Sequence, residues 1–168
     1  LANLKKEIEK LKELKWQVRG ESLKSLKKFI LEKEGESGYA EYKDLMKNLG
    51  VDINLYENKK NTEWIPGHIA ITALVVSVRL FNWDNSVVYE MGKLSITYSA
   101  TAKMFLKYFI SIKRTFEQTI KQWGNYYSQG EFEIKKLDEK NKNAILILKN
   151  FPTHPLECVH ILQFCILS

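Results

Sequence analysis

Apolar residues recur at helical spacing from the start of the chain. The first segment has a three-four-three apolar pattern, with Glu and Lys at the flanking positions: Leu1, Leu4, Ile8 and Leu11. Lys15 interrupts this pattern before Val18. The pattern covers about two heptads of a coiled-coil seam. It predicts the tail of a longer coiled coil, a helix that joins two chains, or a helix docked on its own domain.

The same spacing predicts further helices, separated by turn signals at Gly35, at Gly50 with the polar loop 51–63, and at Asn82-Trp83-Asp84. Pro66 is tolerated in the first turn of a helix, and Asp84 or Asn85 is a suitable N-cap. The predicted helices run from Gly20 to Gly35, over 36–49 and 66–80, from the Asp84 cap onward, and over 100–112 and 114–124.

The period changes after Gly130. Near-alternating apolar residues follow, then a polar turn over 138–143 and the apolar run Ala144–Leu148, a pattern typical of a β-hairpin. Two prolines then precede an apolar segment, 156–167, which predicts a final helix. The order of helices, hairpin and helix predicts an α+β fold.

Composition and charge exclude several classes of protein. A chain of 168 residues with 45% hydrophobic and 27% charged residues is typical of one globular domain. Of the net charge of +6, the first 33 residues carry +5, so the rest of the chain is nearly neutral and nucleic-acid binding is not expected. The uncharged stretch from Ile65 to Val78 is shorter than the ~20 apolar residues of a membrane span. Two cysteines indicate a reducing compartment, and we expect a cytoplasmic protein.

One group of residues has side chains that commonly coordinate metal ions: His154, Cys158, His160 and Cys165. In a helix, His154, Cys158 and Cys165 share one face, and thiolate with imidazole is a zinc ligand set. A closed zinc site needs four ligands, however, and the apolar neighbours favour inert buried thiols. We expect no metal. The chain also lacks a Gly-rich phosphate loop, a nucleophile elbow and an HExxH motif, so we expect no enzyme activity.

Five residues are candidates for binding a small molecule: Trp64, His68, Tyr89, Tyr98 and Trp123. Aromatic side chains of this kind form flat apolar walls in ligand pockets, and they also fill ordinary cores. His68 lies in an apolar helix, where it is either a hydrogen-bonded structural residue or a polar group that orients a ligand.

The order of several motifs resembles a known superfamily. The motifs are Val18-Arg19-Gly20-Glu21-Ser22-Leu23, Glu34-Gly35-Glu36-Ser37-Gly38, Trp64-Ile65-Pro66, Val88-Tyr89-Glu90-Met91-Gly92-Lys93, and Gly130 leading into a hairpin. They resemble the superfamily of haem-nitric-oxide/oxygen-binding (H-NOX) domains, 4-vinyl-reductase-type small-molecule-binding domains and one class of TRAPP tether subunits. The chain looks most similar to uncharacterised bacterial members related to the first two groups. The resemblance covers residues 17–168, with residues 1–16 as a separate N-terminal helix.

The resemblance implies a helical N-terminal half packed on a twisted antiparallel sheet, with a small-molecule cavity between them. H-NOX domains hold haem through an axial His and a Tyr-x-Ser-x-Arg signature. This chain has no His between residues 69 and 153 and no such signature, so neither haem nor another cofactor is expected. Related domains continue into further strands beyond the helix at 156–167. An incomplete sheet, a disordered end and strands supplied otherwise are the alternatives for the C-terminal end.

The function that the resemblance implies is non-enzymatic binding of a small apolar or aromatic molecule by a sensory domain, as a homodimer joined through residues 1–18. The first alternative is a scaffold or tethering module of the same fold with a vestigial pocket. The second is an enzyme that depends on the Cys158 thiol or on a bound metal.

Overall fold

The computed structural model describes residues 2–13, 15–98, 112–141 and 143–151. The elements are α1 (Ala2–Leu11), β1 (Gln17–Arg19), α2 (Glu21–Asn48), α3 (Asn54–Glu57), β2 (Trp64–Pro66), α4 (Gly67–Leu80), α5 (Asn85–Tyr98), α7 (Ile112–Tyr126), β3 (Glu131–Asp138) and β4 (Asn143–Lys149). The described chain therefore mixes helices with antiparallel strands, as predicted. The helices predicted over 100–112 and 156–167 lie outside the described residues, apart from Ile112.

Helix α1 is docked on its own domain. The apolar seam predicted for a coiled coil is buried, with Leu4, Ile8 and Leu11 each at most 7% exposed. The helix packs against α4, and the Glu7 carboxylate lies 2.8 Å from the Arg79 guanidinium. Dimerisation stays a prediction, but α1 offers no exposed seam for it. The N-terminal helix predicted over 1–16 ends at Leu11 in the structure, and β1 begins at Gln17.

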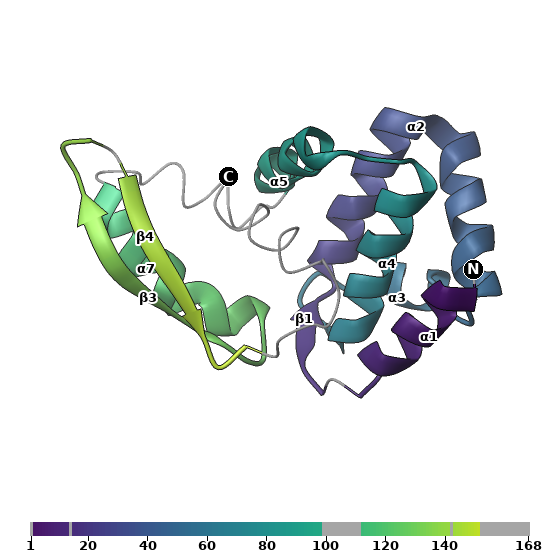
Figure 1. Ribbon diagram of the computed structural model, residues 1–168, viewed down its shortest axis with the longest axis horizontal. Helices are drawn as coiled ribbons and strands as arrows, with labels where there is room; N and C mark the ends of the chain where they lie inside the picture. Colours follow the sequence, from purple (N-terminus) through teal and green to yellow (C-terminus); the bar gives the residue numbers. More distant parts are fainter. Residues whose placement is uncertain (1, 14, 99–111, 142, 152–168) are drawn as a thin grey trace.

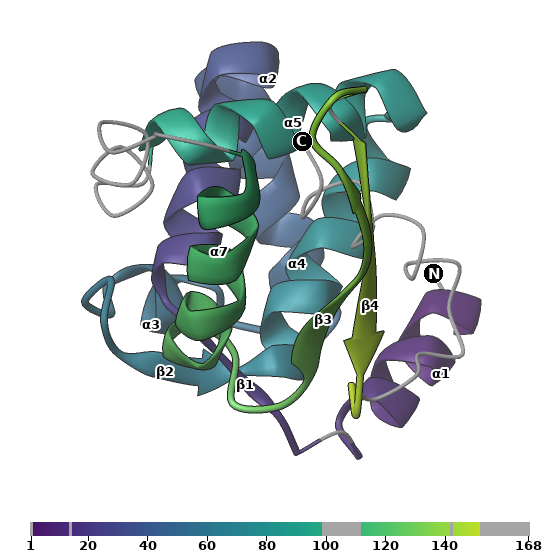
Figure 2. The same ribbon diagram turned by 90° about the vertical axis from the view of Figure 1, so that its left-hand side faces the viewer.

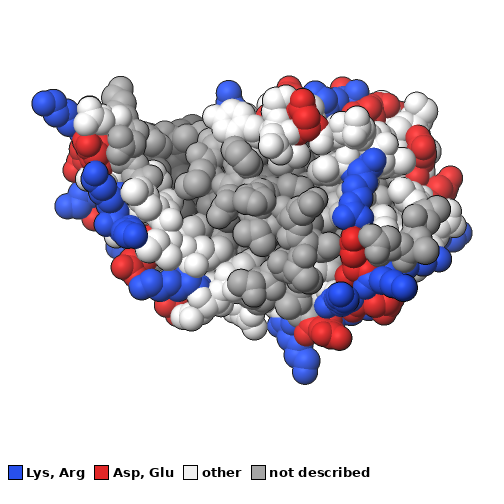
Figure 3. Space-filling view, in the orientation of Figure 1, with Lys and Arg blue, Asp and Glu red and all other residues white. Residues whose placement is uncertain are grey.

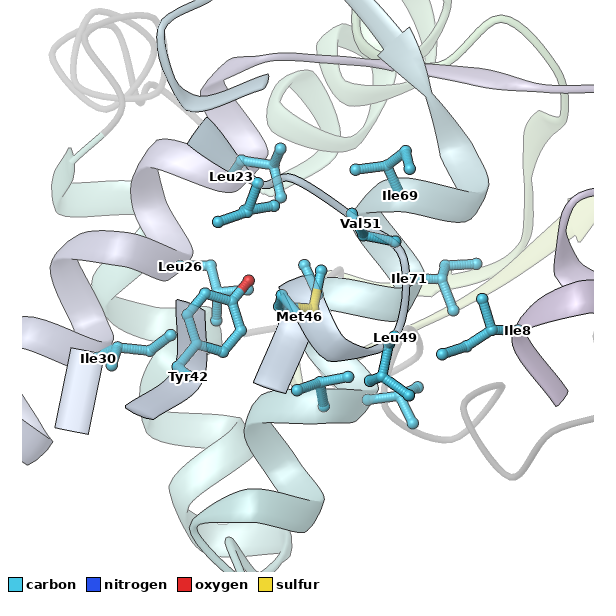
Figure 4. Close-up of a cluster of buried hydrophobic side chains, with 14 of the residues drawn as sticks. Ile8, Leu23, Leu26, Ile30, Tyr42, Met46, Leu49, Val51, Ile69 and Ile71 are labelled. Atoms are coloured by element: carbon cyan, nitrogen blue, oxygen red, sulfur yellow. The ribbon is translucent and has the colours of Figure 1, made fainter. Parts of the chain in front are cut away.

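Helix α2 changes direction at Gly35. Its φ of 71° lies in the left-handed region, which glycine adopts without the steric penalty that a Cβ imposes. The two halves of the helix consequently run along different lines (Figure 1), in agreement with the two helices predicted on either side of Gly35. Figure 4 shows Leu26 and Ile30 of the first half beside Tyr42 and Met46 of the second. Within the loop predicted over 51–63, the structure forms the short helix α3.

Helix α4 is the central helix of the core. Pro66 precedes its first residue, and eight of its residues are buried: Gly67, Ile69, Ile71, Thr72, Ala73, Val75, Val76 and Ser77. The polar side chain of Ser77 is satisfied within the helix, since its hydroxyl donates to the Ala73 carbonyl oxygen at 2.8 Å. Among the described helices, none has both the length and the apolar character to cross a membrane.

Helix α5 begins at the predicted cap. The Asp84 carboxylate accepts hydrogen bonds from the Ser86 hydroxyl at 2.7 Å and from the Val87 N–H at 3.0 Å. These bonds, led by the one from Ser86, stabilise the ionised form and hold the Asp84 pKa below its ordinary value.

The described strands form two separate antiparallel pairs. β1 pairs with β2, so that Val18 lies opposite Ile65, and β3 pairs with β4 in the predicted hairpin. Helix α7 packs along β3 (Figure 2). The pair β1–β2 was not predicted, because a strand of three residues is too short to show a period.

Candidate ligand-binding site

Strand β1 joins the two main parts of the molecule. We call α1, α2, α4 and α5 the helical body, and α7, β3 and β4 the α7–hairpin unit; they lie side by side in Figure 1. One edge of β1 pairs with β2, and the other forms a bridge between Val18 and Tyr127. The Ser128 N–H donates to the Gln17 carbonyl at 3.0 Å, and the Gln17 N–H donates to the Ser128 hydroxyl at 2.7 Å. These hydrogen bonds connect residues that are 111 positions apart in the sequence.

Trp16 lies at the start of this strand and packs on the backbone of α4. The Gly67 N–H donates to the Trp16 carbonyl oxygen at 2.8 Å. A Cβ added at Gly67 would lie 2.3 Å from atoms of the indole ring, so no larger residue fits without displacing Trp16. The ring is 2% exposed. Glycine at this position therefore permits the close approach of Trp16 to α4.

An aromatic cluster continues from Trp16 into the α7–hairpin unit. Trp16 lies 5.1 Å from Phe151 between ring centroids, and Trp123 stacks on Tyr127 at 4.0 Å. Phe132 of β3 meets the Trp123 ring edge-on at 4.5 Å. Such ring pairs add to the stabilisation from their buried area. The cluster is the main apolar contact between the described parts of the unit and Trp16.

Arg19 also connects the helical body with the unit. Its Nε donates to the Asn125 carbonyl at the end of α7 at 2.7 Å, and its Nη1 donates to the Thr62 carbonyl. Its guanidinium carbon stands 3.7 Å from the centroid of the Trp64 ring, a cation–π contact. The guanidinium is therefore held by two segments that are far apart in the sequence, residues 62–64 and the end of α7.

A cavity of about 230 Å³ lies where these parts meet. β1, the first turns of α2, α4, α5 and the end of α7 contribute its walls. Most of the lining side chains are apolar, among them Trp16, Val18, Leu26, Ala70, Leu74 and Met91. A partly open cavity with apolar walls releases poorly satisfied water when an apolar molecule enters. The geometry is suited to holding a small apolar molecule.

The polar residues of the lining come mainly from the start of α2 and the end of α7. They are Arg19, Glu21, Ser22, Ser25, Tyr126 and Tyr127. The Ser22 hydroxyl donates to the Arg19 carbonyl at 3.0 Å. Within the described residues, the hydroxyls of Ser25 and Tyr126 make no hydrogen bond. The lining therefore offers free hydroxyl groups beside apolar walls.

Two of the five predicted ligand-binding residues lie close to this junction but outside the lining. Trp64 of β2 carries Arg19 on its ring, and Trp123 of α7 is buried in the aromatic cluster, where its Nε1 donates to the Gln129 carbonyl at 3.0 Å. Both act as packing residues in the described structure. Each contacts a residue that does line the cavity: Trp64 contacts Arg19, and Trp123 stacks on Tyr127.

The other three predicted residues lie at separate places. His68 is half-buried in the first turn of α4, and burial, together with the charge of Lys12, lowers its pKa. Tyr89 is 44% exposed on α5. Burial and a hydrogen bond from its hydroxyl to the Glu32 carboxylate raise the pKa of Tyr98 to about 12. The structure does not bring the five residues together, and none of them lines the cavity.

The residues that do line the cavity gave little local signal. Trp16 follows the polar end of the first segment, and its surroundings form only when β1 pairs with β2 far along the chain. Tyr126 and Tyr127 gave a weak signal, since two adjacent aromatic residues stood between a predicted helix and Gly130. Long-range strand pairing decides the position of all three.

A second polar cluster lies away from the cavity. Glu57 of α3 has a side chain only 6% exposed, accepts a hydrogen bond from the Tyr39 hydroxyl, and lies 3.4 Å from the Lys27 ammonium. Burial, followed by this bond, raises the pKa of Tyr39. The ammonium of Lys27 also lies 4.9 Å from the Tyr39 ring centroid. The paired charge ties α3 to both halves of α2, which is a structural role.

No group of metal-ligating side chains occurs within the described ranges. The candidate ligands His154, Cys158 and Cys165 lie outside them. Figure 3 shows basic and acidic side chains interspersed around the rim of one face, with uncharged described residues inside this rim. The basic residues on this face do not form a continuous stripe among the parts that the structure describes.

The comparisons with family models, curated proteins and solved structures found no match for this chain. Function is therefore inferred from the cavity and its lining.

Proposed function

We propose that the chain is a non-enzymatic, sensory domain that binds a small apolar or aromatic molecule without haem. In this proposal it is a member of the superfamily that its motifs resemble, with a helical half that covers a twisted antiparallel sheet. The observation that carries the proposal is the apolar cavity between the helical body and the α7–hairpin unit. The resemblance implies a cavity between helices and a sheet, and the strand that lines the cavity described here is β1.

The size of the cavity supports a small ligand. Its volume of about 230 Å³ exceeds the roughly 150 Å³ of an engineered apolar cavity that binds benzene. It is below the roughly 300 Å³ at which pockets for drug-sized ligands begin. A substituted single ring or a short aliphatic molecule suits this volume, whereas a tetrapyrrole is far larger.

The chemistry of the lining supports binding rather than catalysis. Among the described lining residues, Ser22 and Ser25 have no histidine or carboxylate hydrogen-bonded to their hydroxyls, so no activated nucleophile is formed. The guanidinium of Arg19 is already bonded to two carbonyls. Affinity would come mainly from apolar burial, at about 25 cal/mol per Å².

A cavity-filling substitution tests the proposal. Ala70→Leu places three more carbons in the cavity, and Ala40→Leu adds the same carbons at an exposed position of α2 as the matched control. We expect p-xylene and related single-ring compounds to raise the melting temperature of the wild type and of Ala40→Leu. The effect should be lost in Ala70→Leu. Added haem should give no Soret band.

Stabilisation of Ala70→Leu equal to that of the wild type would place the binding elsewhere. No stabilisation of any variant by any compound would favour the alternative of a tethering module with a vestigial pocket.

A further inference from the structure

We infer that the ligand is an uncharged molecule with one hydrogen-bonding group, which meets the hydroxyls of Ser25 and Tyr126 while its apolar body fills the cavity. The inference rests on the proposed function and adds the chemical class of the ligand. Three features carry it: the commitment of Arg19 to protein carbonyls, the position of Glu21 at the N-terminus of α2 beside basic residues, and the two hydroxyls.

Arg19 is the only basic residue of the described lining, and it is poorly placed to bind an anion. Its Nε and Nη1 point to the Asn125 and Thr62 carbonyls, and its plane stands over Trp64. Turning the guanidinium toward a ligand carboxylate would break both bonds and leave β1 held to the end of α7 only by the Val18–Tyr127 bridge and the Gln17–Ser128 hydrogen bonds. An anion that leaves both bonds intact would be desolvated with only the remaining guanidinium N–H groups as donors, which is costly.

Glu21 is the only acidic residue of the described lining, and it stands at the N-terminus of α2. It occupies the first turn of α2, where the unpaired backbone N–H groups stabilise a carboxylate. Arg19 precedes it by two positions, and Lys24 follows one turn later on the same helix. A cationic ligand at this carboxylate would bring an ammonium group toward a region that already holds these two basic side chains.

The remaining polar side chains of the described lining carry neutral hydroxyls: Ser22, Ser25, Tyr126 and Tyr127. Ser22 donates its proton to the Arg19 carbonyl, whereas Ser25 and Tyr126 make no hydrogen bond to the described residues. A hydroxyl both donates and accepts, so it can bond to an alcohol, a carbonyl or an amide of a ligand. A buried polar group gains most when it finds such a partner, which favours a ligand with one polar end.

Four probes of one shape and different charge test the inference on the full chain: p-xylene, 4-methylbenzyl alcohol, 4-methylbenzoate and 4-methylbenzylamine. We expect the alcohol to bind about 3- to 10-fold more tightly than p-xylene, the effect of one neutral hydrogen bond. The benzoate and the ammonium ion should bind more weakly than p-xylene. Calorimetric titration at constant pH measures all four.

Two variants locate the polar end. Tyr126→Phe and Ser25→Ala should reduce or remove the advantage of the alcohol over p-xylene and leave the affinity for p-xylene within about twofold. Tyr89→Phe, which removes an exposed hydroxyl from α5, is the matched control and should keep the full difference.

The outcomes separate the inference from the function on which it rests. Tighter binding of the benzoate or the amine than of the alcohol would overturn the inference and leave small-molecule binding intact. An unchanged preference for the alcohol in both hydroxyl variants would also overturn it. Failure of all four probes, p-xylene included, would overturn the proposed function as well.

Discussion

The helical body and the α7–hairpin unit differ in how they are stabilised. In the body, Ile30, Met46 and Val76 are completely buried at 0% exposure, and the core draws side chains from α1, α2 and α4. In the unit, the most buried described side chains are Trp123 at 7% and Phe132 at 9%. The body has a core of its own, whereas the unit depends on one aromatic cluster and on β1.

The difference follows from the sequence of each part. Helix α4 is apolar on nearly every face and is buried by helices around it, which is the usual position of such a helix. A two-stranded hairpin has little apolar area to bury and is at best marginally stable by itself. Among the described residues, the cavity lies between a part with a large buried core and a part with fewer buried side chains, and a ligand can affect the packing between them.

The largest expected effect contrasts the two parts directly. Met46→Ala should lower the free energy of unfolding by about 3 kcal/mol, because it removes buried carbons and leaves a cavity in the core of the body. Ile145→Ala in β4, where the side chain is 51% exposed, should cost less than about 1 kcal/mol. Urea unfolding measures both. Equal costs would contradict the division into a packed body and a loosely packed unit.

An intermediate effect is expected for the connection between the parts. Arg19→Lys keeps the charge but loses the planar fork that donates to Asn125 and Thr62, and should cost about 1–2 kcal/mol. Hydrogen exchange should become faster in the α7–hairpin unit and stay nearly unchanged in α4. Arg79→Lys, which alters an ion pair inside the body, is the control. Faster exchange throughout the molecule would show that Arg19 does not act as a local connection.

The smallest expected effect is a pH dependence within the helical body. His68 has a pKa below its ordinary value of 6.5, chiefly because burial disfavours the imidazolium. The unfolded chain therefore takes up a proton on His68 at a higher pH than the folded chain does. The contribution of His68 to the free energy of unfolding is complete above about pH 6.5 and is lost as the pH falls through the folded pKa. Urea unfolding between about pH 8 and about pH 5.5 should show this loss, and His68→Gln should reduce it. An unchanged pH profile in His68→Gln would exclude His68 as the source.

Local rules predicted the elements that local chemistry controls. Asp84 caps α5, Gly35 divides α2, and the alternation after Gly130 forms the hairpin, because each depends on residues within a few positions. The heptad pattern of α1 correctly gave a helix, but it could not distinguish a seam between two chains from a face buried against α4.

The site could not be predicted in the same way. Trp16, Ala70 and Tyr126 meet only after β1 pairs with β2 on one edge and with the end of α7 on the other. A strand of three residues leaves no periodic signal, so the sequence pattern does not predict which residues it brings together. The aromatic residues chosen for their type alone, such as Tyr89 and Tyr98, lie elsewhere.

The bend at Gly35 has a consequence for the order in which the chain folds. The two halves of α2 are neighbours in sequence, so Lys27 reaches the Tyr39 ring, at 4.9 Å, after closure of a short loop. By contrast, Arg19 and Asn125 are 106 positions apart, and Gln17 and Ser128 are 111 apart. Contacts between near neighbours form faster than those between distant segments. The folded-back α2 is therefore expected to form early, and the cavity to close last, when β1 meets the end of α7.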